Sequence, residues 1–79
     1  MTSDDVRGLL RNQPFTPFRL YVADGRTLMV PHPDFALIAR GDLVIANEQP
    51  DGSPGNINMI PYEHIVRIEM LPNRRKKAA

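Results

Sequence analysis

The clearest alternation of apolar and polar positions lies in residues 18–35, which read FRLYVADGRTLMVPHPDF. Two runs rich in apolar residues flank Asp24 and Gly25, and an Asp-Gly pair between such runs is typical of a two-residue β-hairpin turn. The pattern therefore predicts a strand over residues 18–23, a tight turn, and a second strand that begins at Arg26.

The length of that turn predicts which side chains share a face, because it fixes the register of the two strands. A two-residue turn sets Leu20 opposite Met29. One face would then carry Phe18, Leu20, Val22 and Met29, and the other Arg19, Tyr21, Ala23, Leu28 and Val30. A hairpin that is apolar on both faces must be covered twice or curl into a small barrel.

Residues 3–12 precede the hairpin and have the spacing of a short amphipathic helix. Ser3 is the expected N-cap, and Pro14 ends the helix and favours an extended approach to the first strand. A single apolar stripe at positions i, i+3 and i+4 is formed by Val6, Leu9 and Leu10. A helix this short is marginal in isolation, so we expect it to dock on the sheet.

The tetrapeptide His32-Pro33-Asp34-Phe35 interrupts the second strand, because proline cannot donate to a sheet ladder. We interpret His32, Asp34 and Phe35 as a structural corner in which Asp34 caps a turn and Phe35 fills the core. The alternative is an acid–base or metal site, since a histidine and an aspartate can serve either chemistry. Residues 34–39 fit both a helical turn and a strand.

Three further strands are predicted, at residues 43–47, 56–60 and 65–71. A polar loop at 49–56 and a turn of 3-10 character at 61–64 separate them. Within the last strand, one face would carry Ile65, Arg67, Glu69 and Leu71.

The predicted order is a helix followed by five short strands, all within residues 1–72 and in one domain. This mainly β order, with its tight spacing, is typical of a small, strongly bent five-stranded antiparallel sheet, an SH3-like barrel. Such a sheet leaves edge strands, which pair readily with a neighbouring subunit. We therefore expect a homo-oligomer, and a ring is a natural form of head-to-tail contact.

The net charge of +1 is unevenly distributed. Residues 1–73 hold six basic and nine acidic side chains, a net charge of −3, and the last four basic residues are Arg74, Arg75, Lys76 and Lys77. We expect residues 73–79 to be a disordered basic tail. Repeated around a ring, this tail would bind nucleic acid through its phosphates; the alternative is a solubilising tail.

Several function classes find no support in the sequence. No apolar run approaches the roughly 20 residues that span a bilayer, and the acidic N-terminus is unlike a signal peptide, so we expect a cytoplasmic protein with no membrane partner. The chain has no cysteine, and its two histidines lack metal-ligand spacing. We expect no catalytic site, no metal, no cofactor and no small-molecule substrate.

Two resemblances add to this interpretation. Residues 14–35 read PFTPFRLYVADGRTLMVPHPDF and resemble a group of short uncharacterised bacterial proteins that share the pattern PFxPFxLxxADGRxxxVxHPDF; this resemblance implies no activity. More distantly, the order of elements is similar to that of Sm-like proteins, including the bacterial RNA chaperone Hfq. Asp34-Phe35 falls near the Phe-Asp corner of that family, and residues 61–65 look like its Tyr-Lys-His-Ala turn, with Glu63 in place of the lysine.

The Sm-like resemblance implies ring assembly and RNA binding, with Tyr62 and His64 at the ring pore. The charge of residues 74–77 would add contacts to phosphates. Two alternative functions follow. The first is a small homo-oligomeric binding or assembly module without catalytic activity, which interacts through sheet edges and apolar faces. The second is an Sm-like RNA-binding protein that uses the pore and the basic tail.

Overall fold

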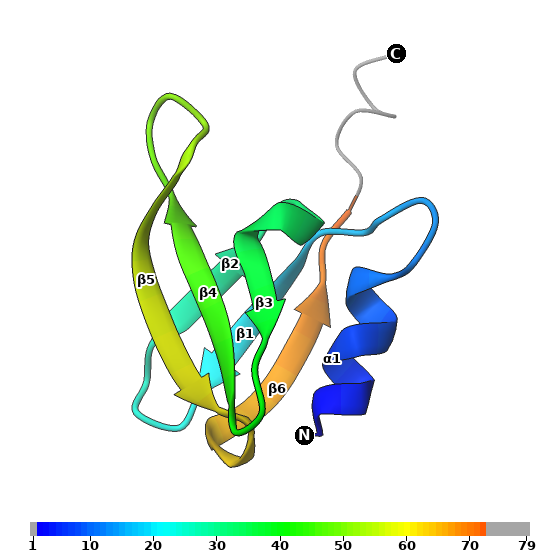
Figure 1. The fold of residues 1–79 in the computed structure, drawn as a ribbon, viewed down its shortest axis with the longest axis vertical. Coiled ribbons are helices and arrows are strands. Elements are labelled where there is room, and N and C mark those ends of the chain that lie inside the picture. The colour runs from blue at the N-terminus through cyan, green and yellow to red at the C-terminus, as the bar shows by residue number, and fades with distance from the viewer. Residues whose placement is uncertain (1, 73–79) are drawn as a thin grey trace.

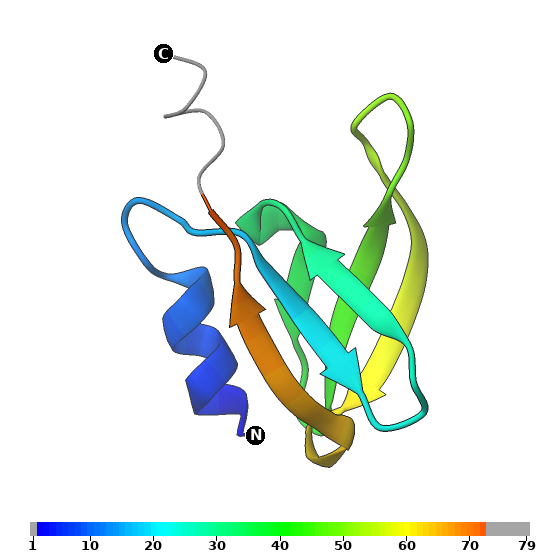
Figure 2. The same ribbon diagram turned by 180° about the vertical axis from the view of Figure 1, so that it is seen from behind.

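The computed structural model describes residues 2–72, which form one helix, six strands and two short 3-10 helices. Two antiparallel sheets of three strands pack together, with strand orders β2-β1-β6 and β3-β4-β5 (Figures 1 and 2). The elements in chain order are α1 (Ser3–Leu10), β1 (Phe18–Val22), β2 (Thr27–Val30), η1 (Pro33–Phe35), β3 (Ala36–Ile38), β4 (Asp42–Glu48), β5 (Pro54–Pro61), η2 (Tyr62–His64) and β6 (Ile65–Met70).

The mainly β class with an N-terminal helix is confirmed, but the single five-stranded sheet is not. The chain between β2 and β3 turns through η1, which begins with Pro33 and follows Pro31. Neither proline can donate to a ladder, so one long bent strand is replaced by two short strands in different sheets. Within residues 2–72 the two sheets are not joined into a closed barrel.

The N-cap of the N-terminal helix lies one residue earlier in the chain than predicted. Thr2, not Ser3, is the N-cap: its hydroxyl accepts from the Asp5 backbone N–H at 3.2 Å, and the Asp5 carboxylate accepts from the Thr2 N–H at 3.1 Å. Such a reciprocal capping box satisfies two backbone donors at once. The helix ends at Leu10 rather than at residue 12.

The predicted register of the first hairpin is wrong by one residue. Tyr21 lies opposite Thr27 and Leu20 lies opposite Leu28, so three residues rather than two form the loop. The Val22 N–H donates to the Arg26 carbonyl at 2.9 Å, and Gly25 takes the left-handed conformation with φ of 96°. A three-residue loop commonly ends with a glycine in that conformation.

This shift changes the character of the hairpin, because a one-residue slip moves every side chain of a strand to the other face. Leu28 and Val30 now join Phe18, Leu20 and Val22 on the inner face, and Met29 lies outside. The hairpin is therefore apolar on one face only, and it does not need to be covered twice.

Residues 34–39 contain both of the predicted alternatives, a helical turn and then a strand. η1 gives one 3-10 turn, and residues 36–38 are a strand. Phe35 is buried as predicted, but no side chain caps this turn, so the capping role expected of Asp34 is not observed. The Phe35 backbone N–H donates instead to the His32 carbonyl at 3.0 Å.

Two later strands also differ from the sequence prediction. β5 begins at Pro54, within the predicted loop 49–56, because Glu48 pairs with Pro54 across a hairpin. β6 contains a bulge at Val66, because Arg67 pairs with Tyr21 whereas Ile65 pairs with Val22. This bulge puts Ile65 on the inner face. Ile65 therefore does not share a face with Arg67 and Glu69.

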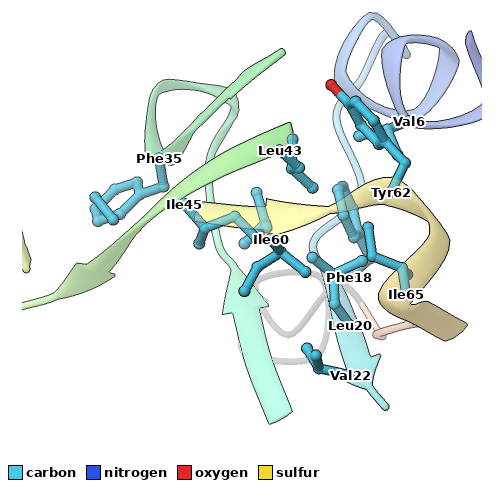
Figure 3. Close-up of a cluster of buried hydrophobic side chains, with 12 residues drawn as sticks. Val6, Phe18, Leu20, Val22, Phe35, Leu43, Ile45, Ile60, Tyr62 and Ile65 are labelled. Atoms are coloured by element: carbon cyan, nitrogen blue, oxygen red, sulfur yellow. The ribbon is translucent and has the colours of Figure 1, made fainter. Parts of the chain in front are cut away.

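The core lies between the two sheets and under the helix (Figure 3). Its fully buried side chains are all apolar and come from α1 and from both sheets. They are Val6, Phe18, Leu20, Val30, Leu43, Ile45 and Ile60. Helix α1 contributes Val6, with Leu9 and Leu10 packed beside it. No buried side-chain nitrogen or oxygen among the described residues lacks a hydrogen-bond partner.

Candidate functional site

The most exposed apolar strand of the molecule is β5, which lies at one edge of the β3-β4-β5 sheet. Ile57 and Met59 alternate along it and point outward, and 62% of the surface of each remains exposed. The eight residues of β5, PGNINMIP, include no charged side chain. Natural edge strands are usually protected by charge, by bulges or by short length. β5 has prolines at its two ends and a bulge at residues 55–56, where two of its residues lie opposite Asn47, so residues 57–60 form its regular uncharged part.

The outward apolar row continues across the sheet from β5. Met59 lies opposite Val44, and Val44 lies opposite Leu37, which is also largely exposed. Contiguous apolar surface of this kind marks interaction sites more often than isolated exposed residues do. The outer face of the β3-β4-β5 sheet is therefore a candidate interaction surface.

The other edge strands among residues 2–72 are better protected than β5. β2 has four residues and β3 has three. β6 exposes Val66, but it carries the charged residues Arg67 and Glu69, which β5 lacks. Helix α1 packs against β3 and lies alongside β6, on the side of the molecule away from β5 (Figures 1 and 2).

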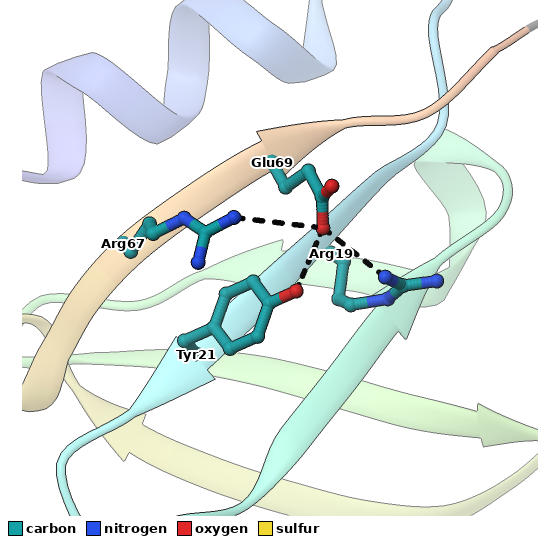
Figure 4. Close-up of polar contacts among 4 residues, drawn as sticks. All are labelled: Arg19, Tyr21, Arg67 and Glu69. Atoms are coloured by element: carbon teal, nitrogen blue, oxygen red, sulfur yellow. Dashed lines mark hydrogen bonds and ion pairs between the residues drawn. The ribbon is translucent and has the colours of Figure 1, made fainter.

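A polar cluster lies on the outer face of the other sheet, at the pairing of β1 with β6 (Figure 4). Glu69 Oε1 accepts from the Tyr21 hydroxyl at 2.7 Å and from Arg19 Nη1 at 3.1 Å. Arg67 Nη2 lies 3.9 Å from the same oxygen, and its guanidinium carbon lies 4.4 Å from the centre of the Tyr21 ring. This cluster was not predicted from the sequence, although Arg19 and Tyr21 alternate along one predicted strand and Arg67 and Glu69 along another.

The Glu69 cluster makes the stability of the protein sensitive to acid. The Tyr21 hydroxyl and the two guanidinium groups hold the pKa of Glu69 below its usual range. A carboxylate whose pKa is depressed by folding stabilises the protein above its unfolded pKa of 4.5, and this contribution is lost as the pH falls through the folded pKa. Hydrogen bonds lower the pKa of Asp5, Asp24 and Asp51 in the same direction.

We expect Glu69→Gln to lose less stability than the parent protein when the pH is lowered from about 5 to about 3. Urea unfolding at each pH, followed by circular dichroism, measures this difference. Glu63→Gln, a change of an exposed carboxylate on η2, is the matched control and should behave like the parent. Equal acid sensitivity of parent and Glu69→Gln would contradict a role for the Glu69 cluster.

The structure places the two predicted pore residues on η2 in different environments. The Tyr62 ring is buried, and its hydroxyl donates to the Ala39 carbonyl at 2.9 Å. Burial raises the pKa of that hydroxyl above its usual range. His64 is exposed, and its carbonyl accepts from the Ala23 N–H at 2.8 Å. The role of both residues in nucleic-acid binding stays a prediction, and in this fold Tyr62 ties η2 to the end of β3.

A groove of about 560 Å³ lies beside the predicted corner. Five prolines line it together with Phe15, Met29 and His32, and Arg19 and Glu48 supply the charged groups. His32 is itself exposed, with its ring centre 5.9 Å from that of Phe35, and Asp34 is exposed as well. The structure brings His32 and Phe35 together as a corner and leaves Asp34 on the surface.

The last four predicted site residues lie outside the described part of the chain. Arg74 to Lys77 follow Pro72, which lines the groove, after one intervening residue. The Leu71 N–H donates to the Pro17 carbonyl at 2.9 Å, which holds the end of the described chain beside the start of β1.

Residues 2–72 contain no group of three or more His, Asp or Glu side chains placed to hold a metal ion. No helix in that range has the length and apolar character needed to cross a membrane. Comparisons of the chain with protein-family models, with curated proteins and with solved structures find no match. The function of the protein is therefore inferred from its surfaces.

Proposed function

We propose that this protein is a small homo-oligomeric binding and assembly module without catalytic activity, which associates through a sheet edge and an apolar sheet face. The observation that carries the proposal is β5, an eight-residue edge strand with no charge and with Ile57 and Met59 exposed. Such an edge offers unpaired backbone N–H and C=O groups to a second strand. A second strand there would also cover the two exposed side chains.

The order and pairing of the strands support an Sm-like or SH3-like relationship as part of this proposal. β2 and β3 are consecutive in the chain and lie in different sheets, as the two halves of one sharply bent strand would. A single 3-10 turn, η2, precedes the last strand, which returns to pair with β1. This arrangement fits a subunit that exposes its edges to other copies, and a cytoplasmic location is part of the same proposal.

The proposal is tested by sedimentation velocity of the protein over a range of micromolar concentrations. We expect the sedimentation coefficient to rise with concentration, as it does for a self-associating protein. A coefficient that stays at the value of a single chain over the whole range would contradict the proposal.

Nucleic-acid binding is a second candidate function, favoured by the short distance along the chain between the groove lining and the basic residues. Arg74 comes two residues after Pro72 on the groove lining, and two residues of extended chain span about 7 Å. Four cations therefore begin within reach of a groove that contains Phe15 and His32. Cations beside stacking surfaces are typical of proteins that bind single strands.

If the second candidate is correct, a U-rich RNA should bind in a salt-dependent manner, and deletion of residues 74–77 should flatten the dependence. Each phosphate contact contributes roughly 0.7 to the slope of log K against log salt for a single strand. The loss of four cations should therefore reduce that slope by up to about 3. Fluorescence anisotropy at several salt concentrations measures it, and absence of binding at low salt would exclude this function.

A further inference from the structure

We infer that the partner of β5 is the β5 strand of a second copy, related by a two-fold axis that passes beside Asn58. This inference rests on the proposed function and gives the assembly its symmetry. Two copies would then share one continuous antiparallel sheet of six strands, in the order β3-β4-β5-β5-β4-β3. A closed two-fold contact uses the same surface patch on both copies.

The first reason is the side-chain pattern of β5. With Asn58 on the axis, Ile57 of one copy lies opposite Met59 of the other, because directly opposite residues of an antiparallel pair point to the same face. Both exposed apolar side chains thus meet apolar partners twice in one dimer. Cross-strand apolar pairs of this kind stabilise a sheet. The row from Leu37 through Val44 and Met59 would continue into the second copy.

The second reason is that the alternative edge, β6, is less suited to receive β5. Helix α1 lies alongside β6 in both views of the fold (Figures 1 and 2). β6 also carries Arg67 and Glu69, whose side chains already pair with Tyr21 and Arg19. A β5 strand placed there would meet a strand on which Arg67 and Glu69 stand between the exposed apolar residues Val66 and Met70. A head-to-tail ring is thus disfavoured relative to a two-fold dimer.

The charged side chains near the proposed axis would not repel each other when two copies meet there. Arg26 reaches toward β5, with its Nη1 3.5 Å from Asn58 Oδ1. Asp24 Oδ2 accepts from Arg26 Nε at 2.8 Å, so each arginine brings its own counter-charge. The two-fold axis therefore juxtaposes two ion pairs rather than two unpaired cations.

The expected strength follows from the size of the contact. Eight residues of strand extend for about 27 Å, whereas a standard interface removes roughly 800 Å² from each partner. That area is about one seventh of the 5399 Å² exposed by one chain. We expect a contact centred on this one strand to bury less than that standard area and to dissociate in the micromolar range.

Disulfide cross-linking tests the inference directly, because the natural chain contains no cysteine. Asn58→Cys should cross-link to itself, since opposite Cα atoms in an antiparallel pair are about 4.5–5.5 Å apart and disulfides accept this distance. Ile57→Cys and Met59→Cys should each stay uncross-linked alone, because their diagonal separation is roughly 7–8 Å. A mixture of these two variants should form a mixed disulfide dimer.

The outcomes separate this inference from the proposed function. Val66→Cys and Met70→Cys place a cysteine on β6. If Met59→Cys cross-links only with chains that carry one of these two changes, the contact is head-to-tail, as in a ring. That result would overturn the two-fold pairing but keep the proposed assembly. Self-cross-linking of Ile57→Cys in place of Asn58→Cys would overturn the assigned axis. No cross-link in any variant or mixture, read on a non-reducing gel after mild oxidation, would overturn both the pairing and the proposed assembly through β5.

Discussion

Replacing Phe18 by alanine should destabilise the protein by about 3–5 kcal/mol, the cost of removing a large aromatic side chain from a packed core. Phe18 is fully buried and lies on β1, the middle strand of the β2-β1-β6 sheet, paired with Val30 on one side and Met70 on the other. A domain of this length has a total stability of about 4–12 kcal/mol, at roughly 0.05–0.15 kcal/mol per residue. The loss is therefore about a quarter or more of the total stability, and at the low end of that range it would unfold the variant.

Urea denaturation followed by circular dichroism measures this loss. Phe15→Ala is the matched control, since Phe15 is also an aromatic residue, packs against Phe18 with ring centres 6.0 Å apart, and is only half-buried. We expect it to cost clearly less than Phe18→Ala. Equal losses for the two variants would contradict the assignment of Phe18 to the centre of the core.

Replacing Met59 by lysine should abolish self-association at micromolar concentration and leave the fold intact. Met59 is largely exposed, so the single chain loses little by the change. In the two-fold dimer each lysine would lie opposite an isoleucine, twice per assembly. Interface side chains that matter contribute more than about 1 kcal/mol each, so two lost contacts should raise the dissociation constant by roughly 30-fold or more. Lysine on an edge strand is also a natural device against pairing.

Val66→Lys is the matched control for this change, because Val66 is equally exposed, at 64%, and lies on β6. It adds the same charge at a position that does not face β5 of a second copy. The control should therefore associate like the parent protein in sedimentation velocity. Loss of association in Val66→Lys but not in Met59→Lys would point to β6 rather than β5 as the interface.

The sequence predicted the elements of this fold better than it predicted their pairing. The hairpin after Phe18, the 3-10 turn at 62–64 and the last strand are all present. The register of the hairpin was wrong because Ala23-Asp24-Gly25 accommodates both a two-residue and a three-residue loop. The choice depends on which β2 side chains reach the core, and Leu28 and Val30 are placed there by packing. Local turn residues do not contain that information.

The candidate site was predicted only in its general nature. Edge strands and apolar faces were expected, but β5 was not singled out, because its first residues have the composition of a loop. Pro54 and Gly55 become a strand only through the pairing of Glu48 with Pro54. The Glu69 cluster was missed for a similar reason: it depends on the pairing of Tyr21 with Arg67 across strands far apart in sequence.

Native mass spectrometry of the parent protein and of Met59→Lys, at the same micromolar concentration, tests the assembly through β5 most directly. We expect dimers of the parent chain and single chains of the variant, with the same charge-state pattern for the folded single chain in both. A parent protein that is present only as single chains, or a Met59→Lys variant that forms dimers as readily as the parent, would contradict assembly through the β5 edge.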